Sequence, residues 1–217
     1  MNLEQARSNM VEQQIRPWEV LDQEVLDLLY VVPREEFVPE KHRALAFSDL
    51  EIPIGDGERM WQPKIEARVL QELGVRRTDR VLEVGTGSGY LTALLAHRAA
   101  QVCSVEIKPG LAQFGRGNLE RHGAENVTLE LGDAARGWPR HAPYDVIVLT
   151  GSTPVLPRAL LDQLAAGGRL FAVVGEAPIM AARLVECSAA QAFHDTILFE
   201  TVIAPLVNCE QPPRFHF

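Results

Sequence analysis

A short apolar segment near the middle of the chain runs directly into three closely spaced glycines. Residues 81–90 read VLEVGTGSGY, with glycine at positions 85, 87 and 89 and a carboxylate at Glu83. This pattern predicts a buried strand, a tight turn and the start of a helix, where bare backbone and unpaired N–H groups face a ligand. The segment therefore predicts a nucleotide-type binding site in an α/β fold.

The details of this segment favour one class of cofactor. The dinucleotide fingerprint has its third glycine where this chain has Tyr90, so a diphosphate site lacks one of its requirements. Glu106 ends the next apolar segment and suits a ribose diol, which NAD and S-adenosylmethionine share. Glu83 would repel phosphates but suits an amino group and a sulfonium. We predict S-adenosylmethionine, the alternative being an ordinary strand, turn and helix with chance glycines.

A third acidic position follows the next predicted strand. Asp133, in Gly132-Asp133-Ala134, lies where parallel strands present their carboxyl ends to a ligand, so it is placed to accept a hydrogen bond from an adenine amino group. The alternative is an ordinary turn aspartate. The predicted cofactor-binding residues are Glu83, Gly85, Thr86, Gly87, Ser88, Gly89, Tyr90, Glu106, Ile107, Asp133 and Ala134.

Strands and helices alternate along most of the chain, which predicts a parallel sheet with right-handed crossovers. We expect an α/β, Rossmann-like fold: a mostly parallel seven-stranded sheet with helices on both faces, plus N-terminal helices. The predicted strands are 81–84, 101–106, 126–131, 144–150, 169–174 and two more within 179–207, with room for a helix between these two. The predicted helices are 3–15, 19–30, one opening at Pro63, 89–98, 110–121 and 155–165, the last capped by Gly167-Gly168; 47–62 is expected to be irregular.

The length of 217 residues fits one structural domain. Within it, we expect residues 1–62 to form a helical and substrate-loop segment packed on a cofactor-binding core, residues 63–217. Pro212-Pro213 predicts a loosely held terminus, in which Phe215 and Phe217 could dock on the fold.

Charge and cysteine content exclude several classes of partner. The net charge is −8 and no run of Lys or Arg stands out, which argues against a nucleic-acid partner bound through phosphates. The three cysteines are widely spaced and no histidine pair has i,i+4 spacing, so we expect no disulfide and no metal. The polar N-terminus and the lack of a membrane-length apolar run predict a cytoplasmic protein without a membrane partner.

Several further segments resemble one family. VPREEFVP at 32–39 and DLEIPIG at 49–55, followed by Gln62-Pro63, are similar to segments of protein-L-isoaspartate O-methyltransferases, and residues 81–90 match that family's cofactor motif. The resemblance spans roughly residues 5 to 207. It implies a class I S-adenosylmethionine-dependent methyltransferase fold. It also implies methylation of the carboxylate of L-isoaspartyl residues in damaged proteins, a protein-repair activity.

The chain departs from this family at the substrate loop. Where the family carries Gln-Thr-Ile-Ser, with hydroxyls associated with the substrate carboxylate, this chain has Glu58-Arg59-Met60-Trp61. Arg59 is a planar donor that can bind a carboxylate in another way. Ser152, after the fourth predicted strand, lies over the expected methyl-transfer position, although it could equally begin a turn. We predict Arg59, Trp61 and Ser152 as the substrate-side catalytic residues.

Three alternatives stay open at this point. Met60 and Trp61 could form an apolar wall for a small-molecule acceptor or another peptide group. The chain could also be a cofactor-binding module without catalysis. An NAD-dependent oxidoreductase is disfavoured by Tyr90 and by the lack of a Tyr-x-x-x-Lys set. The expected partner is a protein or peptide with an isoaspartyl carboxylate, or a small-molecule acceptor, and the oligomeric state is left open.

Overall fold

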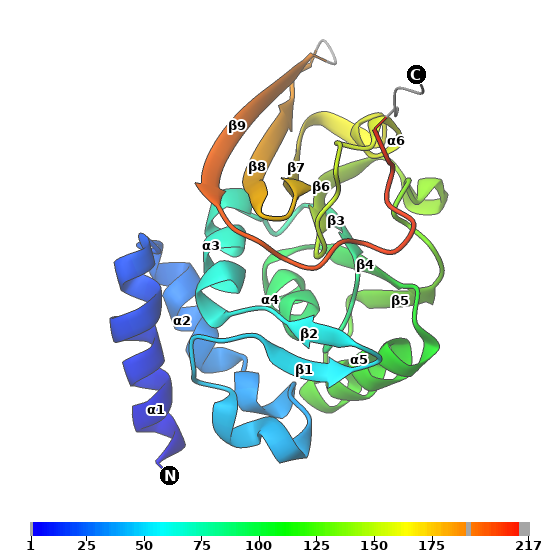
Figure 1. Cartoon of the computed structure of the whole chain (residues 1–217). Coiled ribbons are helices and arrows are strands. Elements are labelled where there is room, and N and C mark those ends of the chain that lie inside the picture. The colour runs from blue at the N-terminus through cyan, green and yellow to red at the C-terminus, as the bar shows by residue number, and fades with distance from the viewer. Residues whose placement is uncertain (1, 190–191, 213–217) are drawn as a thin grey trace.

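The computed structural model describes residues 2–189 and 192–212, and its centre is a seven-stranded sheet (Figure 1). The strands lie in the order β5-β4-β3-β6-β7-β8-β9. All pairs from β5 to β7 are parallel, whereas β8 pairs antiparallel with both β7 and β9, which confirms the predicted mostly parallel sheet. The bounds are β3 Arg80–Val84, β4 Gln101–Glu106, β5 Val127–Leu131, β6 Tyr144–Leu149, β7 Leu164–Glu176, β8 Ile179–Cys187 and β9 Phe193–Glu200.

Successive residues of the central strands pack on opposite faces of the sheet, as strand geometry requires. Val81 belongs to the larger core, and its neighbour Leu82 to the smaller core on the other face. Besides residues of the two N-terminal helices, three later helices contribute to the larger core, while one helical turn and loop residues contribute to the smaller one. These helices are α3 Pro63–Leu73, α4 Tyr90–Arg98 and α5 Pro109–His122, and the single turn is α6 Arg158–Leu161; a short 3-10 turn, Pro139–His141, precedes β6.

The order of the strands creates a crevice at one edge of the sheet. β3 has β4 on one side and β6 on the other, so the loops that follow these strands diverge from one point. In open parallel sheets this switch point at the carboxyl ends is where ligands bind. The glycine loop follows β3 and therefore lies at this point.

The N-terminal segment is helical, with boundaries that differ from those predicted. The second helix begins later than residue 19 because Asp22 caps it, its Oδ1 accepting a hydrogen bond from the Glu24 N–H at 2.9 Å. The elements are α1 Leu3–Met10, a π-helical turn Val11–Ile15, a 3-10 turn Arg16–Trp18, α2 Gln23–Val31 and 3-10 turns Arg34–Glu36 and Glu40–Leu45.

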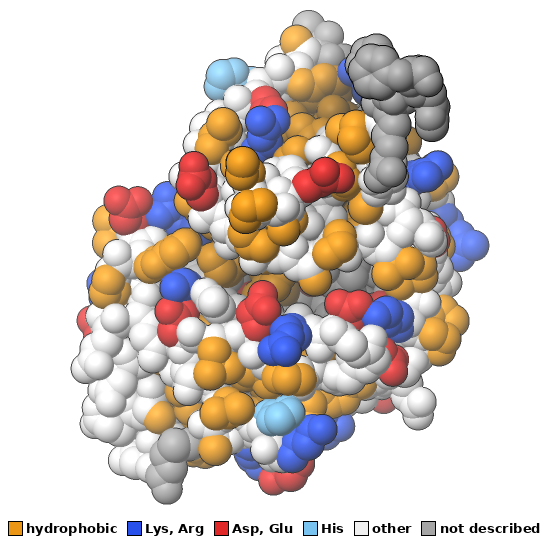
Figure 2. All heavy atoms as spheres, viewed as in Figure 1, with side chains coloured by type: hydrophobic (Ala, Val, Ile, Leu, Met, Phe, Trp, Pro, Cys, Tyr) orange, Lys and Arg blue, Asp and Glu red, His pale blue; other side chains and the backbone are white. Residues whose placement is uncertain are grey.

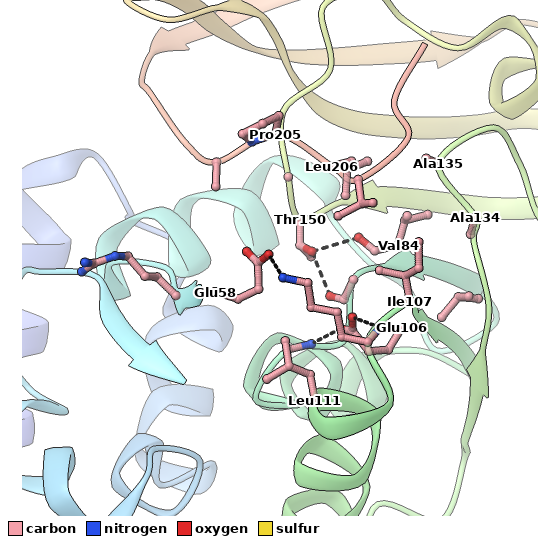
Figure 3. A pocket seen from close by; sticks show the side chains of 18 of the residues that line it. Glu58, Val84, Glu106, Ile107, Leu111, Ala134, Ala135, Thr150, Pro205 and Leu206 are labelled. Carbon is pink, nitrogen blue, oxygen red and sulfur yellow. Dashed lines mark hydrogen bonds and ion pairs between the residues drawn. The ribbon is translucent and has the colours of Figure 1, made fainter. Parts of the chain in front are cut away.

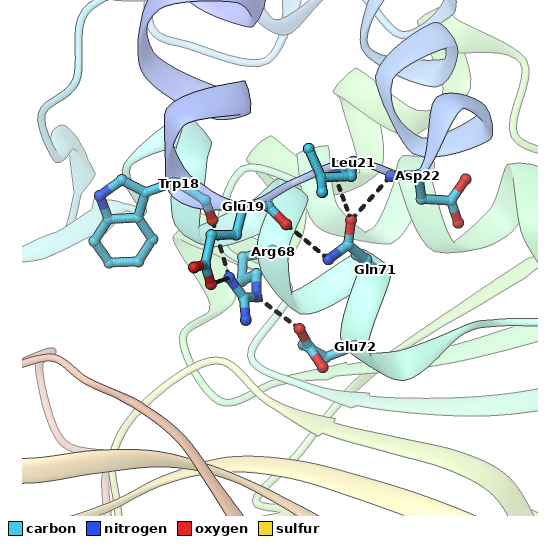
Figure 4. Close-up of polar contacts among 7 residues, drawn as sticks. All are labelled: Trp18, Glu19, Leu21, Asp22, Arg68, Gln71 and Glu72. Atoms are coloured by element: carbon cyan, nitrogen blue, oxygen red, sulfur yellow. Dashed lines mark hydrogen bonds and ion pairs between the residues drawn. The ribbon is translucent and has the colours of Figure 1, made fainter.

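Hydrogen bonds fasten this segment to α3 (Figure 4). Gln71 accepts from the N–H groups of Leu21 and Asp22 at 2.7 and 3.0 Å and donates to the Glu19 carbonyl at 3.0 Å. Arg68 donates to the Trp18 carbonyl at 3.0 Å. Apolar residues of 1–62 and of 63–217 also share the larger core. We therefore propose that the two segments form one structural domain.

The prediction of irregular backbone over 47–62 is wrong for its central part. β1 Ile52–Gly55 and β2 Glu58–Met60 form an antiparallel hairpin, with Ile52 opposite Met60. The turn residues Asp56 and Gly57 have φ of 51° and 83°. Asp-Gly with positive φ at both positions is the signature of a two-residue hairpin turn.

The predicted helix 155–165 is also wrong, since only Arg158–Leu161 is helical. Leu164 already pairs with Tyr144, so β7 begins there and Gly167-Gly168 lies inside the strand at a bulge, not at a helix C-cap. β8 and β9 form an antiparallel pair, and the described residues between them contain no helix. Phe215 and Phe217, predicted to dock, lie outside the described residues.

Candidate cofactor and substrate site

A cavity of about 320 Å³ lies at the carboxyl ends of the central strands (Figure 3). The glycine loop, the loops after β4 and β5, the hairpin β1–β2 and a segment after β9 line it together. The lining includes eight of the residues predicted from the sequence: Gly85, Gly87, Glu106, Ile107, Asp133, Ala134, Arg59 and Trp61.

The glycine loop has left-handed backbone at each glycine, with φ of 98° at Gly85, 53° at Gly87 and 82° at Gly89. A Cβ on Gly85 would lie 2.1 Å from Oγ1 of Thr150, the hydroxyl of which donates to the Gly85 carbonyl at 2.8 Å. Position 85 therefore needs glycine both for its dihedral angle and for its close approach to Thr150. The result is a cradle of bare backbone beside the cavity, as a cofactor of the predicted kind requires.

Glu106 ends β4 and is buried, yet its carboxylate borders the cavity. Oε2 accepts a hydrogen bond from the Gly87 N–H at 2.9 Å, and Oε1 accepts one from the Lys108 N–H at 3.0 Å. A carboxylate oxygen has two lone pairs, so each can accept a further hydrogen bond from a ribose hydroxyl. We propose Glu106 as the ribose acceptor, held in place by the glycine loop itself.

Glu83 lies beneath the glycine loop and is fully buried. Oε2 accepts from Thr92 Oγ1 at 2.5 Å and from Ser104 Oγ at 2.6 Å, whereas Oε1 has no hydrogen-bond partner among the described residues. Desolvation raises the pKa of this carboxyl to about 8. A buried oxygen with no partner beside the cradle suits a cationic donor such as an amino group.

A smaller cavity of about 60 Å³ adjoins the main one, and Glu83, Thr86, Ser88 and Trp61 line it. Gly89 and Tyr90 line neither cavity. Gly89 precedes α4, and the Tyr90 ring packs in the core. We propose that these two positions shape the loop and do not touch the cofactor.

The position of Asp133 is compatible with both interpretations of the sequence, a turn aspartate and an acceptor for the adenine amino group. Its Oδ1 accepts from the Ala135 N–H at 3.0 Å, as a turn aspartate does, and the residue also borders the cavity. Oδ2 accepts from Nδ2 of Asn208 at 2.8 Å. We propose that Asp133 and the buried Ala134 face the adenine ring, with the remaining lone pairs of Asp133 open to its amino group.

Residues 203–208, here called the strap, follow β9 and run in front of the central strands in Figure 1, and residues 204–207 line the cavity. Ser152 fastens the strap by its backbone: its N–H donates to the Ala204 carbonyl, and its carbonyl accepts from the Leu206 N–H, both at 2.9 Å. Pro205 and Leu206 give the cavity an apolar wall. The strap could not be predicted from the sequence, because nothing within residues 203–208 indicates where they pack.

The prediction that Ser152 contacts substrate is not supported by its position. Ser152 is buried, does not line the cavity, and donates its hydroxyl hydrogen to the Ile203 carbonyl at 3.2 Å. We therefore propose Ser152 as an anchor of the strap. Thr150 and Gly151, just before it, border the cavity, and the Thr150 hydroxyl fixes the glycine loop.

The hairpin supplies the opposite wall. Arg59 is exposed at the cavity mouth, and no carboxylate of the described residues lies within 4.0 Å of its guanidinium. Trp61 is buried and packs edge-on against Phe171, with ring centroids 6.4 Å apart. Glu58 and Lys108 form an ion pair across the mouth, where Lys108 also donates to the Asp56 carbonyl at 2.7 Å. Among the residues that the structure describes at this mouth, Lys108 is paired with Glu58, whereas Arg59 has no carboxylate partner.

A second cluster of polar groups lies away from this cavity. The candidate ligand atoms of Cys103, Glu130 and His141 are all within 4.8 Å of one another. Glu130 already accepts from His141 at 2.7 Å and from Arg140 at 3.0 Å, and burial raises the pKa of the Cys103 thiol to about 12. Because Arg140 compensates the carboxylate and the thiol favours its neutral form, we propose no metal here.

Comparison with known proteins gives one consistent result. The family model for protein-L-isoaspartate(D-aspartate) O-methyltransferase matches residues 5–211. A protein-L-isoaspartate O-methyltransferase of Methanoculleus marisnigri is 47% identical over 169 residues, which cover 78% of this chain and 77% of the relative. One from Syntrophobacter fumaroxidans is 42% identical over 176 residues, covering 81% and 82%.

Two solved structures share the fold. A protein-L-isoaspartate O-methyltransferase superposes with a TM-score of 0.80 at 26% identity, over 93% of this chain and 66% of that one. A Plasmodium falciparum β-aspartate methyltransferase, solved in complex with S-adenosyl-L-homocysteine, also gives 0.80, at 20% identity over 95% and 99%. The class I methyltransferase fold expected from the sequence is thereby confirmed.

Proposed function

Since this chain belongs to the protein-L-isoaspartate(D-aspartate) O-methyltransferase family, we propose that it methylates the carboxylate of L-isoaspartyl residues in damaged proteins, with S-adenosylmethionine as methyl donor. The observation that carries the proposal is the backbone cradle at Gly85, bordered by Glu106 at the carboxyl edge of the sheet. The relatives named above are all isoaspartate methyltransferases. A different acceptor, a non-catalytic module and an NAD-dependent enzyme are therefore not favoured.

The residues of the site fit this chemistry. The cofactor, when bound, would supply a methyl group on a sulfonium: an oxygen nucleophile bonds to the methyl carbon in line as the carbon–sulfur bond breaks, and the thioether of S-adenosylhomocysteine leaves. A carboxylate has a pKa of about 4 and is already ionised at neutral pH, so it needs no general base. No histidine or cysteine lines the main cavity within the described residues. The protein therefore acts by alignment and by exclusion of water, and alignment alone can supply about 7–11 kcal/mol.

Each wall of the cavity has a proposed task. Glu106 and Asp133 hold the ribose and the adenine, and the unpartnered oxygen of Glu83 accepts from the amino group of the methionyl part. Arg59 binds a carboxylate of the acceptor peptide from the hairpin side. Trp61, with the strap opposite it, keeps water from the transferring methyl group.

The direct test is transfer of labelled methyl groups to a peptide that contains one L-isoaspartyl residue. We expect a base-labile ester that releases labelled methanol. The matched control is the same peptide with ordinary aspartate, which should give only background. Methanol release equal to that of the control, from enzyme that binds the cofactor, would contradict the proposed acceptor.

Cofactor affinity should also depend on pH through Glu83. Its pKa of about 8 leaves the carboxyl neutral at lower pH, and an ammonium group favours the ionised form, so binding must release this proton. Affinity should thus rise by up to about tenfold per pH unit from about pH 5 to about pH 6.5, which is more than one pH unit below the pKa of about 7.7–8.0 of an α-amino group. Calorimetry in two buffers of different ionisation enthalpy measures the released proton. Glu83→Gln should flatten the profile, and an unchanged profile in this variant would refute the assignment.

We also infer a cytoplasmic location and no nucleic-acid partner. The net charge is −8, and Figure 2 shows acidic and basic side chains interspersed on the face that it displays. Cys103, Cys187 and Cys209 are all free. None of the helices in the described part of the chain has the length and apolar character needed to cross a bilayer.

A further inference from the structure

Arg34 is the bulkiest of the completely buried side chains, with 1% of its surface exposed. Its guanidinium contacts four separate segments. Nε donates to the Ala46 carbonyl at 2.9 Å, Nη2 donates to the Trp61 carbonyl at 2.5 Å, and Nη1 forms an ion pair with Glu66. The guanidinium carbon also lies 5.1 Å from the centroid of the Tyr90 ring.

A buried ion pair is an expensive way to fill a core. Removing two charges from water offsets most of their attraction, and apolar residues of similar volume are often equally stabilising. What a guanidinium adds is direction, because its planar fork holds several acceptors in fixed positions at once. The role of Arg34 therefore depends on which groups it holds in position.

These groups belong to both sides of the cavity. Trp61 connects β2 to α3, and its side chain lines the main cavity. Glu66 lines the smaller cavity beside Gly85 and Gly87. Tyr90 is the first residue of α4, directly after the glycine loop. One buried side chain thus connects the hairpin wall to the helix that carries the cofactor loop.

We propose that Arg34 is a positioning residue, which sets the distance between the acceptor wall at Trp61 and the methyl group of the cofactor. Arg34 lines neither the main cavity nor the smaller one, so it acts through the Trp61 carbonyl and through Glu66. The inference rests on the proposed function, since it concerns the acceptor side of the same site.

The test is Arg34→Lys. Lysine keeps a charge for Glu66, but a single ammonium cannot hold the Ala46 and Trp61 carbonyls at once. A displacement of about 1 Å near a reacting centre costs up to about 100-fold, so we expect kcat/KM for the isoaspartyl peptide to fall by about 10- to 100-fold. The Kd for S-adenosylmethionine should change by less than about twofold, because the cradle and Glu106 are untouched.

Arg169→Lys is the matched control. Arg169 is also a largely buried arginine: it donates to the Gly74 carbonyl and to Asp79, each at 2.7 Å, at the far end of α3. It lines neither cavity of the site. This variant should lose stability but keep its kcat and its KM for the peptide. Equal losses of activity in both variants would show that Arg34 only stabilises the fold, and would overturn the proposal.

A second measurement does not depend on the reaction. With Trp18→Phe and Trp138→Phe, Trp61 is the single tryptophan, and acrylamide quenching reports how firmly its wall is held. Arg34→Lys in this background should increase the quenching constant, and Arg169→Lys should not.

If the wild-type chain fails to methylate the peptide, the proposed function fails while quenching still decides the role of Arg34. If Arg34→Lys does not fold, Glu66→Gln takes its place, and unaltered quenching in that variant would refute the inference.

Discussion

Alanine at position 85 is expected to abolish measurable binding of S-adenosylmethionine. The new Cβ would lie 2.1 Å from Oγ1 of Thr150, on a residue with φ of 98°. Either Thr150 gives up its hydrogen bond to the loop carbonyl, or the loop moves into the space that the cofactor needs. We expect no saturation at about 100 times the wild-type Kd, a loss of more than about 2.7 kcal/mol.

Gly123→Ala separates the effect on binding from backbone strain. Gly123 has φ of 76° and ends α5, and a Cβ there would meet no atom within 4 Å. The left-handed conformation should cost this variant about 1–2 kcal/mol of stability without affecting cofactor binding. Calorimetry gives the affinity and thermal unfolding gives the stability. Full affinity in Gly85→Ala would show that the cradle is not the cofactor site.

Glu106→Ala is expected to give the second largest loss of cofactor affinity. The substitution removes the proposed ribose acceptor and leaves the N–H groups of Gly87 and Lys108 without their partner. Losing a charged acceptor costs about 1–3 kcal/mol, which corresponds to about a 5- to 150-fold higher Kd.

Asp79→Ala provides the comparison for this loss. Asp79 is also a buried carboxylate that accepts from a backbone N–H, that of Arg76 at 2.8 Å, but it lies outside the cavity. We expect it to lower the unfolding temperature while leaving the Kd unchanged. An unchanged Kd in Glu106→Ala would refute the ribose assignment. Replacing the cofactor by its 2′-deoxy analogue should lower affinity less in Glu106→Ala than in the wild type. The hydrogen bond between Glu106 and the 2′-hydroxyl is already absent in that variant.

The central sheet and the cofactor cradle could be predicted because their signals are local. Val81 to Tyr90 carries strand, turn and helix start within ten residues, and the structure places β3, the loop and α4 there. The apolar run before Thr150 likewise gave β6. Each of these elements is specified by the spacing of apolar residues within it and by the glycines that border it.

Elements specified by contacts were predicted less well. The apolar residues between Pro157 and Leu164 suit a helix, but Leu164 pairs with Tyr144 and ends it after one turn. The hairpin does have a local signal, since Asp56-Gly57 is a typical two-residue turn. Pro53 lies within β1, however, and a proline argues against a strand, so β1 was not predicted.

The substrate side depended most on tertiary structure. Arg59 and Trp61 were found because they depart from a resemblance, not because their spacing indicates a site. Nothing in the sequence near Ser152 shows that its hydroxyl is used by the Ile203 carbonyl, about fifty residues away. Arg34 lies within the VPREEFVP segment, but nothing in that segment indicates its role, because its four partners come from other parts of the chain.

The strap has a consequence for biosynthesis. Residues 203–208 are translated after every strand of the sheet, yet they complete the wall above the glycine loop. A nascent polypeptide that has emerged from the ribosome as far as Glu200 can assemble all seven strands while its cradle is still open to solvent. We therefore expect the cofactor to bind only after the strap has emerged, and a chain cleaved between β9 and Asn208 to lose affinity for the ligand together with the core contacts of Ile203.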